Sequence, residues 1–384
     1  MKKTLLYPWH KTASARFASF AGFDMPIQYG SAVEEHRLCR RSAGLFDISH
    51  MGRILLCGEG TGEALSALVS SSILDMKTGE ARYALLLNER GGIIDDLFIY
   101  RLKESAGYKD PWFIVINAGN RETDLAWITP RLPSQVSLND LSDTLFMIAV
   151  QGPKAVELLD RLAGPASAGG GLPEGVPESS VVNTIPRSFM ARLSLADIPV
   201  LAGRTGYTGE DGAEIYYSAE KAETLWEIIL GEANKAGIEA GPVGLAARDS
   251  LRFEAGMPLH GHEISPEITP LEALLSWACD FNKEFTGKEA LLEQKKAGLK
   301  RKLITLNVTG GVPREGYSVL NKEKTRIGEV VAGMFCPTTG TYSANAFVTP
   351  EYTAAGTLLA VEIRGNPKEA EVIKRPLYVP VYRR

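Results

Sequence analysis

Apolar residues recur at two different spacings along the chain, and each spacing predicts one kind of element. Alternating or short apolar runs bounded by glycine predict strands near residues 46, 54–57, 81–87, 93–101, 112–118, 145–150, 188–202 and 213–217. Apolar residues three and four positions apart predict helices at 31–43, 60–71, 120–130, 219–237 and 242–255. A further helix is expected to open at Pro153, since proline is favoured at the start of a helix.

The pattern changes beyond residue 300, where short strands and turns follow one another without helical spacing. This predicts a small all-β domain at the C-terminal end. Two loops interrupt the earlier part. NERGG at 88–92 fits the loop of a β-hairpin. The Gly- and Pro-rich stretch 164–178 follows a helix rather than a strand, so we interpret it as a mobile loop and not as a phosphate-binding turn.

Composition narrows the class of protein. The 384 residues are 45% hydrophobic and 23% charged, which is typical of a globular protein with a sizeable core. A net charge of −4 argues against nucleic acid as the main partner. No apolar run approaches the roughly 18–20 residues that span a bilayer, and the N-terminal run is too short for a signal peptide. The four cysteines show no paired spacing, so we expect reduced, buried thiols in a cytoplasmic protein without membrane contact.

Two adjacent carboxylates stand inside the apolar run GGIIDDLFIY at 91–100. In a strand, Asp95 and Asp96 point to opposite faces, and both faces are apolar further along. A strand buried on both sides cannot hide two ionised carboxylates without partners. One alternative places one aspartate at the mouth of the strand and the other in a pocket, as a base or as a partner for a cationic or N–H group. The other alternative is a turn pair that caps backbone N–H groups.

A second polar stretch, GRTGYTGEDGAEIYY at 203–217, places a glycine-rich acidic turn before a strand. That strand contains Glu214, and Tyr207 and Tyr216 flank it. An aromatic ring beside a carboxylate suits a flat heterocycle with N–H donors, because the ring stacks and the carboxylate accepts two hydrogen bonds. A hairpin with one exposed face is the plainer alternative.

A third stretch, GLAARDSLRFEAG at 244–256, carries Arg248 and Arg252 on one helix face. They could pair with the carboxylates around 210–214 or with an anionic ligand, and buried ion pairing is the plainer interpretation, more so for Arg252. The histidines offer less. His260 and His262 form an H-x-H without a visible third ligand, so no metal site is expected. His50 is expected to be a packed, hydrogen-bonded core residue.

These stretches, taken together and in order, resemble the T protein family of the glycine cleavage system, the aminomethyltransferases. The resemblance is carried by FAGFDMPIQY (20–29), EEHRLCRRSAGLFDISHMG (34–52), GGIIDDL (91–97), INAGN (116–120), VQGP (150–153), RTGYTGEDGAEI (204–215), LAARDSLRFEAG (245–256) and EFTGKEAL (284–291). They extend over nearly the whole chain. The chain departs from the family pattern at Phe23, His260, Ala332 and Cys336.

The resemblance implies an α+β fold, a three-domain cloverleaf of the folate-binding T-protein type with a small all-β C-terminal domain. We expect a discontinuous first domain from residues 1–50 and about 140–240, and a second from 51–139 and about 241–283. Residues 284–384 would form a barrel or jelly-roll-like domain.

The resemblance also implies a reaction and a partner. Members of the family take the aminomethyl group carried on the lipoyl arm of H protein. Tetrahydrofolate attacks it, ammonia leaves, and 5,10-methylenetetrahydrofolate and dihydrolipoyl H protein remain. Tetrahydrofolate is thus expected as co-substrate and lipoylated H protein as partner, and we expect a monomer.

Carried over by motif, the resemblance makes Asp96 the catalytic carboxylate and Glu214 the pterin-binding glutamate. The other pocket positions that it implies are Met51, Tyr83, Asn117, Tyr207 and Arg248. Arg248 would meet the anionic folate tail or hold Glu214 in place.

Two other functions fit part of the pattern. A folate-dependent demethylase of the same fold would act on a small methylated substrate without H protein. A non-enzymatic iron–sulfur assembly factor of the superfamily would carry a K-G-C-Y-x-G-Q-E signature, and EFTGKEAL at 284–291 lacks its cysteine.

Overall fold

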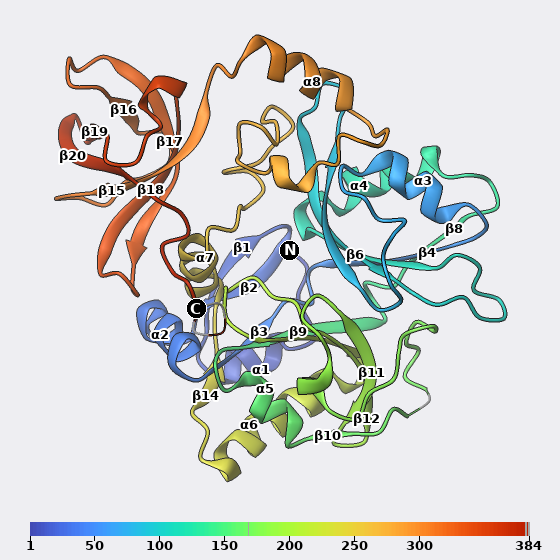
Figure 1. Cartoon of the computed structure of the whole chain (residues 1–384). Helices are drawn as coiled ribbons and strands as arrows, with labels where there is room; N and C mark the ends of the chain where they lie inside the picture. The colour runs from blue at the N-terminus through green and yellow to red at the C-terminus, as the bar shows by residue number, and fades with distance from the viewer. Residues whose placement is uncertain (168, 381, 383–384) are drawn as a thin grey trace. The chain divides into compact units, whose positions relative to one another are not determined.

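The computed structural model describes residues 1–167, 169–380 and 382, which combine helices with β-sheets (Figure 1). The chain divides into two compact units. One unit holds Met1–Leu68, Ser72–Ala84 and Asp96–Asp249, and the other holds Val69–Ser71, Leu85–Asp95 and Ser250–Arg384. The α-helices are α1 Tyr7–Thr12, α2 Ala32–Arg41, α3 Thr61–Leu68, α4 Arg121–Ile128, α5 Ala155–Asp160, α6 Ala222–Ala236, α7 Leu245–Glu254 and α8 Lys288–Ala297.

The first unit contains a seven-stranded sheet in which every pairing but one is antiparallel, the exception being β14 with β3. In spatial order its strands are β10 Ala163–Gly164, β11 Met190–Leu195, β12 Ile198–Gly203, β13 Gly212–Ser218, β9 Leu145–Gln151, β3 Ala43–Asp47 and β14 Ala240–Pro242. The helices α5 and α6 cover one face of this sheet (Figure 1).

Alternation along β13 decides what each face of the sheet carries. Ala213, Ile215 and Tyr217 are fully buried in the core that α5 and α6 share with the sheet. Successive strand side chains point to opposite faces, so Glu214 and Tyr216 project from the other face. The apolar pattern thereby sends the polar side chains of β13 away from the helix-covered core.

A five-stranded sheet contains the aspartate pair. Its spatial order is β5 Ala81–Leu87, β6 Ile93–Arg101, β7 Trp112–Ile116, β4 Gly52–Cys57 and β8 Ser137–Asp140. A separate hairpin of β1 Arg16–Phe20 and β2 Phe23–Gln28 closes through Ala21 and Gly22, both with positive φ. Two consecutive left-handed residues are the conformation of a tight hairpin turn, which gives the glycine of FAGF a structural reason.

The second unit ends in a closed β-barrel, which confirms the predicted all-β C-terminal region (Figure 1). Its strands are β15 Lys302–Val308, β18 Thr341–Val348, β17 Arg326–Cys336, β16 Ser318–Leu320, β19 Leu358–Ile363 and β20 Asn366–Ile373. Alternate residues such as Ile304, Leu306 and Val308 fill the interior. Two of the departures from the family pattern, Ala332 and Cys336, are buried in a small cluster with Phe253.

Most predicted elements are present, with corrections at their ends. The helix expected at Pro153 begins at Ala155, because Gly152 has a φ of +134° and the next two residues complete a turn. The helix predicted over 60–71 ends at Leu68. The loop predicted at 164–178 begins inside β10, and its residue 168 lies outside the described residues. The three-domain division and its boundaries stay a prediction.

The cysteines match their expectation, since all four are free and buried. Within the described residues, no helix is long and apolar enough to cross a membrane.

Arg252 and Glu263 form a fully buried ion pair in the second unit, with 2.8 Å between Nη1 and Oε2. Asn345 donates to the other carboxylate oxygen at 2.6 Å, and the Leu259 amide donates at 3.0 Å. Burial raises the pKa of Glu263, but Arg252 and these donors outweigh it and hold that pKa below its ordinary value. The interpretation of Arg252 as a residue of a buried structural ion pair is thus confirmed. Its partner is Glu263 and not one of the carboxylates near 210–214.

We predict that Arg252→Met lowers the free energy of unfolding by about 3–5 kcal/mol, because Glu263 is left buried without its countercharge. Urea denaturation at neutral pH measures the change. The control is Arg326→Met, which removes a solvent-exposed pair with Glu329 and should change stability by less than about 1 kcal/mol. Equal effects of the two substitutions would contradict the assigned role of the buried pair.

Candidate active site

The carboxyl end of β7 places three of the predicted site residues at one edge of the five-stranded sheet. Phe98 on β6 pairs with Val115 on β7, and carrying this register two residues on sets Asp96 opposite Asn117. The Asn117 side-chain amide donates to Asp96 Oδ1 at 2.8 Å and to the Asp96 carbonyl at 3.3 Å. Met51 directly precedes Gly52, which pairs with Ile116, so Met51 lies at the same edge.

The two aspartates of β6 differ in exposure. Asp95 is fully buried, whereas Asp96 is half-buried. Both belong to the strand, and the turn before it is capped instead by Asn88, whose Oδ1 accepts from the amides of Arg90 and Gly92 at 2.9 and 3.0 Å. The interpretation of the aspartates as a turn pair is therefore wrong. Asp96 is the one that a small molecule could reach.

Tyr83 extends this edge from β5. Its ring meets that of Phe98 at a centroid distance of 5.8 Å and an angle of 67°. Phe98 follows Asp96 by two positions, so the two side chains share one face of β6. An aromatic wall thus stands on the face to which the Asp96 carboxylate points.

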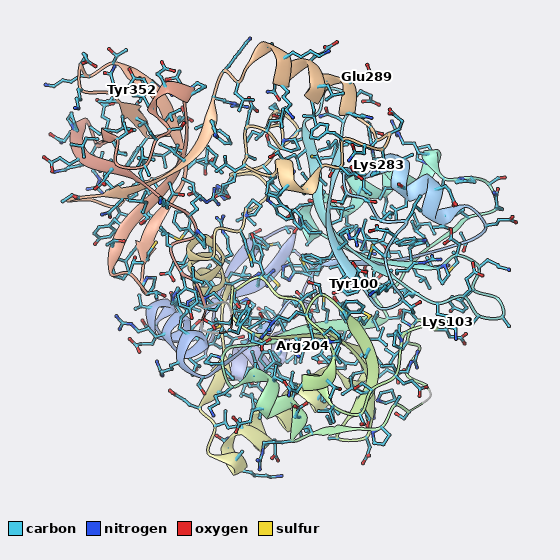
Figure 2. All side chains as sticks on the ribbon, viewed as in Figure 1. Tyr100, Lys103, Arg204, Lys283, Glu289 and Tyr352 are labelled. Atoms are coloured by element: carbon cyan, nitrogen blue, oxygen red, sulfur yellow. The ribbon has the colours of Figure 1, made fainter. Side chains whose placement is uncertain are left out.

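Glu214 is the centre of a second polar group. Thr205 Oγ1 donates to its Oε2 at 2.5 Å, and Tyr216 Oη donates to the same oxygen at 3.5 Å. Burial raises the pKa of Glu214, and the nearby hydroxyls and Arg248 only partly oppose this. The Tyr100 hydroxyl lies 2.9 Å from Thr205 Oγ1 (Tyr100 is labelled in Figure 2). Tyr100 shares its β6 face with Asp96, so one strand contributes to both polar groups.

Arg248 lies over the ring of Tyr207, with 4.8 Å from the guanidinium carbon to the ring centroid. This is a cation–π contact. Burial lowers the pKa of Arg248, while Tyr207 and Glu214 oppose the shift. Within the part of the chain that the structure describes, Arg248 forms no ion pair with a carboxylate, so it does not hold Glu214 by a direct salt bridge.

The loop that carries Tyr207 is fixed from both ends. Arg204, labelled in Figure 2, donates to the carbonyls of Gly212, Val182 and Ile185 and pairs with Asp211 at 2.6 Å. These contacts close the two ends of the acidic turn against each other.

Gln151 fixes the middle of the same loop. Its amide donates to the Thr205 carbonyl at 3.1 Å, and its Oε1 accepts from Thr208 at 3.0 Å. A Cβ at Gly206 would lie 2.0 Å from Gln151 Oε1, so a larger residue there would have to displace the Gln151 amide from its hydrogen bonds. Sequence reasoning missed Gln151, although it belongs to the quoted VQGP motif.

His50 is buried, as expected, but its hydrogen bonding was predicted wrongly. Its ring packs edge-on against Phe20 and Phe23 at centroid distances of 5.6 and 6.3 Å. Its Nδ1 has no hydrogen-bond partner among the described residues. Burial, helped by the charge of Arg248, lowers the pKa of His50 to about 3, so the imidazole is neutral at physiological pH.

His262 Nδ1 lies 2.9 Å from the Val331 carbonyl in the second unit. Residues 1–167, 169–380 and 382 contain no cluster of three His, Cys, Asp or Glu side chains that could hold a metal ion.

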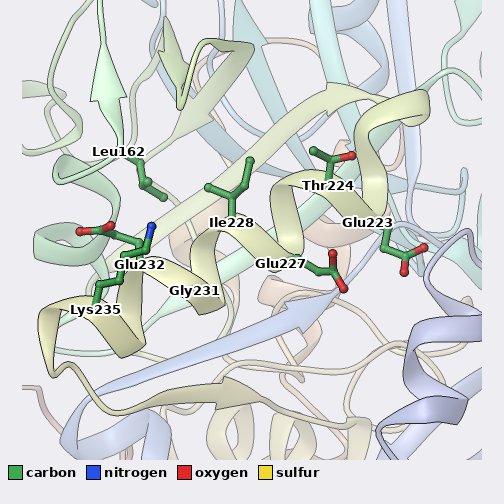
Figure 3. Close-up of a pocket in the computed structure, with 8 residues that line it drawn as sticks. All are labelled: Leu162, Glu223, Thr224, Glu227, Ile228, Gly231, Glu232 and Lys235. Carbon is green, nitrogen blue, oxygen red and sulfur yellow. The ribbon is translucent and has the colours of Figure 1, made fainter.

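A pocket of about 560 Å³ lies along the outer side of α6 (Figure 3). Its lining is Leu162, Glu223, Thr224, Glu227, Ile228, Gly231, Glu232 and Lys235. It contains none of the predicted site residues, and its charged groups are solvated side chains of one helix, with Glu232 paired to Arg161 at 2.8 Å. We therefore place the candidate site at the strand edges described above.

Two family models match the sequence, and together they cover most of the chain. The GCVT N-terminal domain matches residues 6–283. The glycine cleavage T-protein C-terminal barrel domain matches residues 301–378, which contain the barrel strands.

Curated relatives are similar over the full length. The aminomethyltransferase of Caldanaerobacter subterraneus subsp. tengcongensis is 38% identical over 100% of this chain and 98% of its own. That of Synechococcus elongatus is 40% identical over 96% and 93%. The crystal structure of glycine cleavage system aminomethyltransferase T from Bartonella henselae superposes with a TM-score of 0.86 at 34% identity, covering 99% of this chain and 98% of that one. The chain therefore belongs to the glycine cleavage T-protein family, the aminomethyltransferases of the glycine cleavage system.

Proposed function

We propose that this aminomethyltransferase moves the methylene carbon of an aminomethyl group from lipoylated H protein to tetrahydrofolate. In this reaction the folate nitrogens N5 and N10 each lose a proton and bond to the carbon. The carbon–nitrogen and carbon–sulfur bonds break, and one proton passes to the lipoyl sulfur and one to the departing ammonia. Membership of the family implies folate use. The observation that best supports the proposed reaction is the position of Asp96, which is half-buried beside Asn117 and the aromatic rings of Tyr83 and Phe98.

We assign Asp96 to the reacting nitrogen. A carboxylate held in place can position that nitrogen and offset the positive charge that develops as it attacks and ammonia departs. The hydrogen bond from Asn117 at 2.8 Å supports this role, because it holds Asp96 Oδ1 in one orientation. Met51 and Tyr83 then line the same region as pocket walls.

We assign Glu214, Tyr207 and Arg248 to the folate itself. The pyrimidine edge of a pterin presents N–H donors that a carboxylate accepts, and Glu214 lies on the sheet face opposite the helix-covered core. Tyr207 offers a ring for stacking. Arg248, which forms no ion pair with a carboxylate among the described residues, suits the anionic folate tail.

The activity is tested directly with purified protein, aminomethyl-loaded H protein and tetrahydrofolate, by following ammonia release with and without the folate. Fast release that depends on tetrahydrofolate supports the proposal. Transfer of a carbon from a small methylated substrate to tetrahydrofolate in assays without H protein would instead indicate the demethylase alternative. We also propose that the enzyme is cytoplasmic and monomeric. Sedimentation of the purified protein tests whether it is a monomer.

We predict that Asp96→Asn lowers the rate of ammonia release by about 100-fold or more while the Kd for tetrahydrofolate changes by less than about threefold. The amide keeps the shape but cannot offset positive charge. Asp95→Asn should lower the rate much less, by under about tenfold, since Asp95 faces the other side of β6.

Initial rates and calorimetric folate binding give both quantities, and thermal unfolding shows whether either variant is misfolded. If the two aspartate variants exchanged phenotypes, the assignment of Asp96 would be wrong.

We predict that Glu214→Gln weakens tetrahydrofolate binding by about 30- to 100-fold, because the amide replaces an acceptor with a donor that opposes the pterin N–H groups. The same change should raise the melting temperature of the folate-free protein at pH 7.5. The pKa of Glu214 is raised in the fold, so its ionised form destabilises the protein above the ordinary carboxyl pKa.

The stability gain should vanish near pH 4, where the carboxyl is protonated in both the folded and the unfolded protein. Glu220→Gln, at an exposed position just beyond β13, is the matched control and should change neither property. A lower melting temperature for Glu214→Gln at pH 7.5 would contradict this reasoning.

A further inference from the structure

Three side chains around Glu214, those of Tyr100, Thr205 and Tyr216, form a connected polar group with it, and their function has not been assigned above. Tyr100 Oη and Thr205 Oγ1 are 2.9 Å apart, and Thr205 Oγ1 and Glu214 Oε2 are 2.5 Å apart. Tyr216 Oη lies 3.5 Å from Glu214 Oε2 and 3.5 Å from Tyr100 Oη. The short distances run in one line, from Tyr100 through Thr205 to the carboxylate.

Proton counting gives this line a direction. An ionised carboxylate only accepts hydrogen bonds, so the Thr205 hydroxyl must donate its single proton to Glu214. The Thr205 oxygen can then only accept a second hydrogen bond, and the Tyr100 hydroxyl donates it. Burial, followed by the charge of Glu214, raises the pKa of the Tyr100 phenol, so Tyr100 keeps its proton at all physiological pH values.

The line engages only one oxygen of Glu214. The hydrogen bonds from Thr205 and Tyr216 both go to Oε2, and among the residues that the structure describes none forms a hydrogen bond with Oε1. Oε1 is also not one of the buried unpartnered atoms of the described residues, so it reaches accessible surface. The carboxylate is thus anchored through one oxygen and open through the other.

The anchor is itself held rigidly. Thr205 is fixed by its backbone, since its carbonyl accepts from the Gln151 amide at 3.1 Å. The ring of Tyr100 is fully buried and packs against Phe113 at 5.9 Å and Tyr216 at 6.5 Å between centroids. A donor that cannot move selects one rotamer of its acceptor, which is how supporting residues preorganise a binding group.

We propose that Thr205, oriented by Tyr100, is a positioning residue that turns Glu214 so that Oε1 meets the N–H donors of the bound pterin. The inference rests on the proposed role of Glu214 in folate binding. It adds that the orientation and the ionisation of this carboxylate depend on the hydroxyl group of a residue that is not among the pocket positions implied by the resemblance.

The test compares Thr205→Val, which keeps the shape and removes the hydroxyl, with Thr205→Ser, which restores it. We expect Thr205→Val to raise the Kd and the KM for tetrahydrofolate by about tenfold, with kcat within about twofold of the native enzyme, because the hydroxyl acts on binding and not on the reacting atoms. Thr205→Ser should restore both values to within about threefold. Tyr100→Phe, which removes only the second donor, should give a smaller increase.

A pH profile separates positioning from general structural support. Losing a donor raises the pKa of Glu214, so folate binding by Thr205→Val should decline at a higher pH than in the native enzyme as the solution is acidified. The other groups that face Glu214 are Tyr216 on its own strand, Tyr100 on β6 and Arg248 on α7, and these are unchanged in that variant. A variant that is merely destabilised would bind less folate at every pH, but the pH at which binding declines on acidification (the acid limb of the profile) would not change.

Thr144→Val is the matched control, because the Thr144 hydroxyl bonds only its local turn, the Leu141 carbonyl, at 3.3 Å. Native-like affinity and an unmoved acid limb in Thr205→Val, with binding still lost in Glu214→Gln, would overturn the inference and leave the proposed function standing. Native-like folate binding by Glu214→Gln would instead remove the proposed role of Glu214, and the inference with it.

Discussion

The arrangement of the candidate site depends on one constraint, the two-residue alternation of strands that are packed on one face. On β13 the odd-numbered side chains from Ala213 to Tyr217 are committed to the core beneath α5 and α6. Glu214 and Tyr216 have no freedom to turn toward that core without losing its apolar contacts. The same alternation on β6 aligns Asp96 with Tyr100. The register between β6 and β7 then sets Asn117 opposite Asp96, where its amide donates to the carboxylate.

Such a site opposes stability in a specific way. Burial raises the pKa of Glu214, and its neighbours compensate only in part for surroundings that favour its neutral form. Other buried charges in the chain have more complete sets of hydrogen-bond and ion-pair partners. Arg204 satisfies its guanidinium with three carbonyls and Asp211, and Arg252 has a carboxylate partner. Arg204 and Arg252 are thus buried charges that support the fold, whereas Glu214 keeps one oxygen that can still accept hydrogen bonds from a ligand.

Sequence reasoning located the long strands and helices because their apolar periods are strong. It gave no sign of α1, β8 or α8, which are short, weakly amphipathic or on the surface, so their apolar spacing carries little information. The choice between the aspartates shows a second limit. Periodicity separated Asp95 from Asp96 but could not say which was accessible, since both faces of β6 read as apolar. The aromatic partners of Arg248 and His50 come from segments far apart in the chain, and no local pattern encodes them.

The contact between Gly206 and Gln151 has a consequence for how this sequence can diverge. The missing side chain of one residue is occupied by the amide of the other, 55 positions earlier, and that amide also supports the loop on both sides. A larger residue at 206 would clash with the Gln151 amide, and loss of that amide would remove its hydrogen bonds to Thr205 and Thr208. Descendants of this chain that gained a side chain at 206 would have to move or shorten the side chain at residue 151, so substitutions at the two sites should be coupled.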